Sequence, residues 1–77
     1  MPVRAYVFIE TIPAKARQVA GSVAKLPGVK MADPVTGSYD VIVLVEAKEV
    51  VALGEFISAR VHRLAGVVKT TTNVVVD

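Results

Sequence analysis

The chain has 77 residues, which is enough for one small domain, and 53% of them are hydrophobic. It contains no cysteine and a single histidine, which excludes disulfides and thiolate metal sites and argues against zinc. No apolar run reaches the roughly 18 residues of a membrane helix, and no signal peptide begins the chain. We therefore expect a cytoplasmic protein without cofactor, metal or membrane contact. A short chain with this much apolar surface also predicts self-association.

The nine lysine and arginine residues are spread along the chain among seven acidic residues, for a net charge of +2. Proteins that bind nucleic acid usually concentrate their basic side chains on one face. We therefore expect no direct binding of DNA or RNA.

The first half reads as strand, helix, strand. Residues 3–10 are rich in β-branched and aromatic side chains, which predicts a strand. Pro13 suits the first turn of a helix, and apolar residues then recur at helical spacing from Ala16 to Leu26 until Gly28 ends the run.

The second strand of the first half is the less certain prediction, at residues 29–36. Pro34 cannot donate to a strand ladder, so this strand is expected at a sheet edge or beside a bulge. The second half then repeats the order strand, helix, strand. Residues 40–47 and 67–76 are predicted strands. Between them, one helical stripe is formed by Val50, Leu53, Ile57, Val61 and Leu64.

A shift of 38 residues places apolar residues on apolar residues, which reveals an internal repeat. Val3 falls on Val41, Leu26 on Leu64 and Gly28 on Gly66. Two β-α-β units with right-handed crossovers predict a four-stranded antiparallel sheet with both helices on one face. The expected fold class is α+β, a ferredoxin-like βαββαβ open-faced sandwich formed by residues 1–77 as one domain.

Alternation along the strands predicts which side chains face the helices. Val3, Ala5, Val7, Val41, Val43 and Val45 are expected to point toward them, and Tyr6, Phe8, Ile42 and Leu44 to point away. An exposed apolar patch of this kind is usually an interface. We therefore predict a dimer, an α/β barrel formed by stacking two bare sheet faces.

The sequence offers little catalytic chemistry. Ser38 is not in a Gly-x-Ser-x-Gly elbow, the acidic residues show no paired spacing, and there is no glycine-rich phosphate loop. His62 lies between Arg60 and Arg63 and is interpreted as a surface residue. We expect no catalytic residue and no enzymatic activity.

The segment Gly37-Ser38-Tyr39-Asp40 between the halves has two interpretations. It is a typical hairpin turn, with glycine supplying positive φ and aspartate making turn hydrogen bonds. Alternatively, its backbone N–H groups and the Asp40 carboxylate could bind the carboxylate and ammonium groups of a zwitterion. Residues 70–72, three threonines, favour a strand but also offer hydroxyl groups on alternate faces.

The segments Leu26–Val29, Val35–Asp40 and Arg63–Thr70 resemble the amino-acid-binding effector domain of Lrp/AsnC-type regulators, called the RAM domain. The resemblance covers nearly the whole chain. Full regulators of this family carry an N-terminal helix-turn-helix, and this sequence starts at its first strand, so it is similar to the stand-alone RAM modules.

The resemblance implies a βαββαβ module that pairs through its sheet face and assembles into rings, often octamers. It implies that small amino acids bind at the boundary between dimers. Carried over residue by residue, the ligand-binding set is Gly37, Ser38, Tyr39 and Asp40, with Thr70 and Thr72 contributed by a neighbouring subunit.

The leading hypothesis is therefore a non-enzymatic amino-acid-binding module that oligomerises and modulates transcription or amino-acid metabolism through a partner regulator of Lrp/AsnC type. Two alternatives stay open. One is an ACT-like allosteric domain, which shares the topology and ligand class. The other is a small dimeric α+β-barrel enzyme, which would need a polar residue facing the cleft between helices and sheet.

Overall fold

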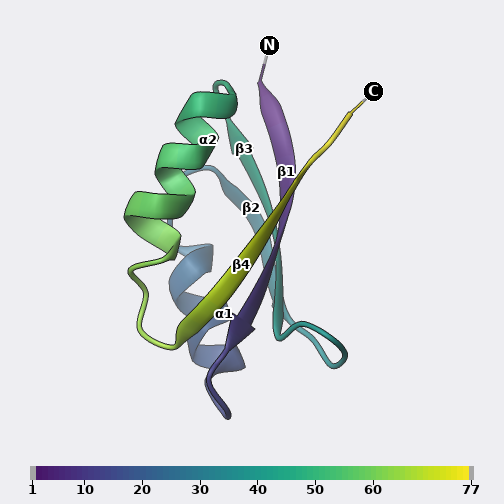
Figure 1. Ribbon diagram of the computed structural model, residues 1–77, viewed down its shortest axis with the longest axis vertical. Coiled ribbons are helices and arrows are strands. Elements are labelled where there is room, and N and C mark those ends of the chain that lie inside the picture. The colour runs from purple at the N-terminus through teal and green to yellow at the C-terminus, as the bar shows by residue number, and fades with distance from the viewer. Residues whose placement is uncertain (1, 77) are drawn as a thin grey trace.

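The structure is a computed structural model and describes residues 2–76. Its elements follow the predicted order, β-α-β-β-α-β. Their bounds are β1 Val3–Thr11, α1 Ala16–Ala24, β2 Val29–Pro34, β3 Val41–Ala47, α2 Val50–Phe56, the π-helical segment η1 Ile57–Val61, and β4 Val67–Val74. Figure 1 shows both helices on one side of the sheet and both ends of the chain at the same end of the molecule.

The four strands are antiparallel and lie in the order β2-β3-β1-β4. The two halves therefore interleave, because the first strand of each half lies at the centre and the second at an edge. This confirms the predicted ferredoxin-like arrangement. The strand register pairs Tyr6 with Leu44 and Phe8 with Ile42, so these four side chains share one face.

The core lies between the helices and the other face of the sheet. No polar or charged side chain is buried among residues 2–76. The predicted inward positions on β1 and β3 are buried, except for the half-buried Val3 at the start of β1. The buried residues are Ala5, Val7, Ile9, Val19, Ala20, Val23, Val41, Val43, Val45, Leu53, Ile57 and Val61.

The weak strand prediction is confirmed at β2, which is an edge strand ending at Pro34. Its register with β3 shifts between Val29 and Met31, away from Pro34, whose missing N–H was the reason for expecting an edge or a bulge. The extra residue places Met31 opposite Leu44, on the face away from the helices. The sequence pattern did not identify Met31 as part of that face.

Both helices differ in detail from the prediction. The first begins at Ala16 and not at Pro13, because Ala14 adopts a φ of 69° and interrupts helical geometry. The second passes into η1, where the His62 N–H donates to Ile57 O over 2.9 Å. Val50 belongs to the predicted apolar helical stripe but is 59% exposed, since it opens the helix just beyond the end of β3.

The repeat is visible in two equivalent turns that follow the helices. Val29 N–H donates to Leu26 O and Val67 N–H donates to Leu64 O, each over 3.3 Å. The glycine inside each turn has a positive φ, 88° at Gly28 and 98° in the second turn. Only glycine adopts this region without strain, which explains the repeated position.

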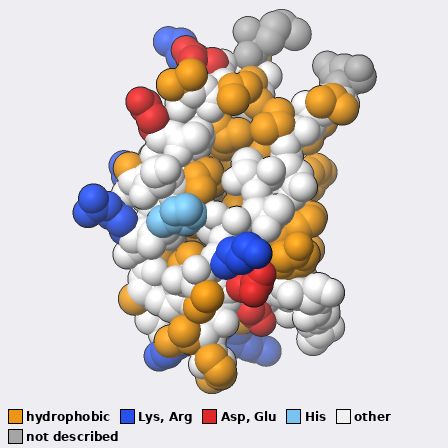
Figure 2. Space-filling model, in the orientation of Figure 1, with side chains coloured by type: hydrophobic (Ala, Val, Ile, Leu, Met, Phe, Trp, Pro, Cys, Tyr) orange, Lys and Arg blue, Asp and Glu red, His pale blue; other side chains and the backbone are white. Residues whose placement is uncertain are grey.

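The face of the sheet away from the helices is apolar. We call it the open face and define it by Tyr6, Phe8, Met31, Ile42 and Leu44. Tyr6 and Met31 are each 39% exposed, and the other three are half-buried. Figure 2 shows hydrophobic side chains along the right-hand margin, the side of the sheet opposite the helices. The predicted outward set is thus confirmed, with Met31 added.

The Gly28 turn generates a stability prediction. A β-carbon at Gly28 would lie 2.6 Å from Glu46 O, on the backbone of β3, at a φ that side chains rarely adopt. We expect Gly28→Ala to lower the free energy of unfolding by about 2–4 kcal/mol. The matched control is Gly21→Ala in α1, where no atom lies within 4 Å. It should raise the free energy by about 0.5–1 kcal/mol. Urea unfolding at one protein concentration tests both, and equal stabilities would contradict the proposed contact.

Candidate ligand-binding site

The turn between β2 and β3 is an exposed hairpin loop. Val35 N–H donates to Asp40 O over 2.9 Å, which closes the hairpin at its base. Gly37 has a φ of 134°, and an added β-carbon there would meet no atom within 4 Å. Thr36, Gly37 and Ser38 are exposed. The hairpin interpretation is therefore confirmed in its closed base and in the positive φ of Gly37, and the loop is open to an approaching molecule. The expected turn hydrogen bond of the aspartate side chain is not found among the described residues, because the Asp40 carboxylate accepts from Thr11 on β1.

Asp40 is the fixed point of this turn. Its N–H donates to Ile9 O over 2.9 Å, and its side-chain Oδ2 accepts a 2.8 Å hydrogen bond from the Thr11 N–H. The pairing of β1 with β3 ends at Ile9 and Val41, so the carboxylate supplies the acceptor that the ladder no longer offers. Among the described residues, only one of the two carboxylate oxygens accepts a hydrogen bond. Oδ1 is therefore available to a cationic group.

Tyr39 is anchored on the open face. Its ring lies 4.9 Å from the ring of Phe8, centroid to centroid, at an interplanar angle of 42°. Offset and tilted pairs at this separation are favourable aromatic geometry. The contact joins the loop to β1, so the loop position depends on a residue of the open face.

The expectation of free backbone donors is met only in part. The Asp40 N–H is engaged by β1 and cannot serve a ligand. The N–H groups of residues 36–39 make no hydrogen bond to another described residue. The available donors are therefore those of the exposed loop.

Thr70 and Thr72 lie apart from the turn within one chain. They pair with Ile9 and Val7, whose side chains belong to the core, so both hydroxyls lie on the helix side of β4. Tyr39 lies on the open face, on the other side of the sheet. A single chain therefore does not bring the two groups together, and a site that uses both must include a second subunit.

His62 is exposed, as predicted, but it has a partner that the sequence did not indicate. Its Nε2 lies 2.6 Å from the Thr70 Oγ1, which connects the end of η1 to β4. Figure 2 shows the histidine at the surface. The residues around His62 in the sequence do not indicate this hydrogen bond. The position of the His62 side chain follows from the π-helical turn that directly precedes it. The Thr70 hydroxyl is thus oriented by His62.

A hollow of about 250 Å³ opens between the start of α1 and the end of β2. Its walls are Ala16, Arg17, Pro34, Val35 and Thr36. Thr36 is the residue before Gly37, so the hollow adjoins the turn. Sequence reasoning missed this feature, because residues 16–17 and 34–36 are brought together only by the packing of α1 against β2.

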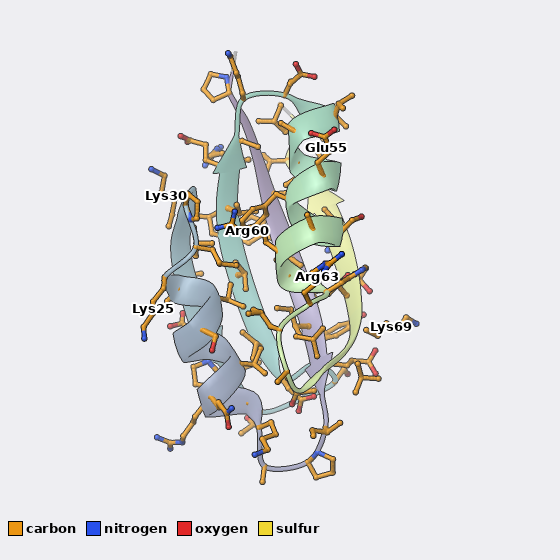
Figure 3. The ribbon with its side chains drawn as sticks, turned by 90° about the vertical axis from the view of Figure 1, so that its left-hand side faces the viewer. Lys25, Lys30, Glu55, Arg60, Arg63 and Lys69 are labelled. Carbon is orange, nitrogen blue, oxygen red and sulfur yellow. The ribbon has the colours of Figure 1, made fainter. Side chains whose placement is uncertain are left out.

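The other charged residues do not form a comparable site. Within residues 2–76, no three histidine or acidic side chains are grouped closely enough to hold a metal ion. No described helix is long and apolar enough to cross a membrane. Figure 3, viewed from the helix side, shows Lys25, Lys30, Arg60, Arg63 and Lys69 spread over different elements.

Comparison with known proteins identifies the family. The model of the Lrp/AsnC ligand binding domain matches residues 4–77. A helix-turn-helix-type transcriptional regulator of Pyrococcus abyssi is 34% identical over 70 residues, covering 91% of this chain and 44% of the relative. The chain spans about half the length of the curated relatives it matches.

Solved structures show the same fold. The hypothetical protein PHS023 from Pyrococcus horikoshii is 31% identical with a TM-score of 0.89, covering 96% of this chain and 89% of that one. A regulator from Neisseria meningitidis, NMB0573, solved as an L-Met complex, is 23% identical with a TM-score of 0.85, covering 97% of this chain and 50% of that one. Its similarity shows the fold alone. The match over nearly all residues, together with the relative from Pyrococcus abyssi, shows that this chain belongs to the Lrp/AsnC ligand-binding domain family.

Proposed function

We propose that this chain is a non-enzymatic module that binds a small amino acid at the Gly37–Asp40 turn and assembles into dimers and larger rings, such as an octamer. Through that assembly it modulates a partner regulator of Lrp/AsnC type, and thereby transcription or amino-acid metabolism. The proposal includes a cytoplasmic location and no direct contact with nucleic acid or membrane. The ligand-binding residues are Gly37, Ser38, Tyr39 and Asp40, with Thr70 and Thr72 from a neighbouring subunit.

The observation that carries the proposal is the fixed carboxylate of Asp40. One oxygen accepts from the Thr11 N–H, and the other accepts no hydrogen bond from a described residue. Beside it, the exposed loop offers backbone N–H groups without acceptors. An ammonium on the free oxygen and a carboxylate on the loop donors would satisfy both charges of an amino acid.

A relative supports the class of ligand. The Neisseria meningitidis protein of similar fold was solved with L-methionine. Ligand binding is also the property after which the family is described.

The core supports a non-enzymatic role. An enzyme that acts between the helices and the sheet would need a polar side chain in that space. The described residues bury none there, and the core is aliphatic. The polar groups lie on the loop and on β4, where they can bind a molecule. The one imidazole–hydroxyl contact among the described residues, His62 with Thr70, lies at the surface, outside the space between the helices and the sheet.

The open face supports the dimer. It presents two aromatic and three aliphatic side chains beside one another on β1, β2 and β3. Stacking two such faces would remove these side chains from water, at roughly 25 cal/mol for each Å² of apolar surface. Because Tyr39 rests on Phe8, the same contact would also limit the movement of the ligand loop.

A charge on the open face tests the assembly. We expect Leu44→Glu to yield a monomer near 8.1 kDa at micromolar concentration, because an unpaired buried charge costs several kcal/mol. Sedimentation measures the mass. The control is Val51→Glu on α2, a residue that is 65% exposed, and its assembly should match that of the unchanged chain. A monomeric unchanged chain would contradict the proposed dimer.

The turn is tested by Asp40→Asn together with a thermal-shift screen of the twenty amino acids, since a ligand bound to the folded state raises Tm. Asparagine still accepts from the Thr11 N–H but has no charge for an ammonium. Affinity for the best ligand should fall by about ten- to a hundredfold, the loss typical of a hydrogen bond to a charged group.

Calorimetry measures this affinity, and sedimentation on the same sample checks that the assembly is intact. Unchanged affinity in Asp40→Asn would show that the ammonium is bound elsewhere. A screen in which no amino acid raises Tm or binds in calorimetry would contradict the proposed function itself.

A further inference from the structure

The hollow between α1 and β2 has a mixed chemical character. Ala16, Pro34 and Val35 give it apolar walls, while Arg17 and Thr36 supply the polar groups. Its volume of about 250 Å³ is slightly below the roughly 300 Å³ at which drug-sized pockets begin. A site of this size and composition suits a short aliphatic chain that ends in a polar group.

The hollow and the turn are joined through the base of the hairpin. Val35 lines the hollow, and its N–H donates to Asp40 O over 2.9 Å. Thr36 lines the hollow and directly precedes Gly37. The hollow therefore adjoins the N-terminal side of the turn, and an amino acid whose α-amino group meets Asp40 would enter it by extending along the base of the hairpin.

Arg17 is the only charged side chain in the walls of the hollow. Among the described residues, the one ion pair is between Lys30 and Glu46, so Arg17 has no acidic partner there. The neighbouring cation, Lys15, directs its Nζ to Gln18 Oε1 at 3.4 Å. The guanidinium of Arg17 is thus available, and its planar donors match a carboxylate.

We propose that the hollow is the side-chain subsite of the ligand and that Arg17 selects an acidic amino acid. The methylene groups of the ligand contact Ala16, Pro34 and Val35. The terminal carboxylate pairs with the Arg17 guanidinium, and the Thr36 hydroxyl supplies a further donor. This inference rests on the proposed function, because it requires the α-amino and α-carboxylate groups to be bound at the turn.

The matched probes are L-glutamate and L-glutamine, which have nearly the same shape and differ in side-chain charge. By calorimetry on the full chain, we expect glutamate to bind about five- to twentyfold more tightly than glutamine, given that an exposed pair contributes less than a buried one. Arg17→Gln should remove this preference and leave the glutamine affinity within about twofold.

Arg63→Gln is the control, because Arg63 is also an exposed arginine but does not line the hollow. It should keep the preference for glutamate. Equal losses in both variants would indicate a general effect of positive charge and would overturn the subsite.

The two proposals fail in different ways. If the unchanged chain binds glutamate and glutamine equally, or binds an apolar amino acid more tightly, the acidic subsite is wrong. The proposed function still stands in that case, provided that Asp40→Asn weakens the binding. If no amino acid binds at all, both proposals are wrong.

Discussion

The alternation of side chains along β1 and β3 is the constraint on which the structure depends. Ala5, Val7 and Ile9 face the helices and form the core with the matching residues of β3. A strand places successive side chains on opposite faces, so Tyr6 and Phe8 are sent to the other side. Within residues 2–76, α1 and α2 with its continuation η1 all lie on one face of the sheet. An apolar open face is therefore a consequence of building the core, and the proposed dimer would cover it with a second copy of the same face.

The same central strands determine where the candidate site lies. The pairing of β1 with β3 ends at Ile9 and Val41, and the Asp40 side chain takes over as the acceptor for Thr11. A carboxylate with a backbone partner on one oxygen has a defined direction for the other. The loop that follows β2 then has one fixed end at Asp40 and one aromatic contact through Tyr39. A rigid sheet thus supports an exposed loop, which is a common arrangement for binding residues.

Sequence periodicity was sufficient for the fold because each half repeats the same signals. Gly28 and Gly66 follow the helices at matched positions, and both have positive φ. Local patterns also placed Pro34 at a sheet edge. They did not predict where the first helix begins, because the φ of 69° at Ala14 is set by the turn that joins β1 to α1. They also did not predict η1, since the four-residue spacing of Leu53, Ile57 and Val61 is also expected of an α-helix.

The site was less accessible to sequence reasoning than the fold. The Gly37–Asp40 turn was visible from its residue types and from the family resemblance, and its hairpin geometry is confirmed. Its role in binding stays a prediction. The bonds that orient the polar groups join distant residues: Asp40 with Thr11, and His62 with Thr70. The hollow likewise depends on the packing of α1 against β2. None of these contacts leaves a periodic signal in the sequence.

The division between core and site makes binding and stability separable in this chain. Arg17, Thr36 and Ser38 are exposed, and none belongs to the aliphatic core. Their substitution removes groups that face solvent, and surface changes of this kind usually alter stability by less than about 0.5 kcal/mol. Tyr39 is the exception, because its ring packs on Phe8 and joins the loop to the open face. A change at Tyr39 would therefore mix the two properties, whereas the charge of Arg17 can be removed while the sheet and the loop stay in place.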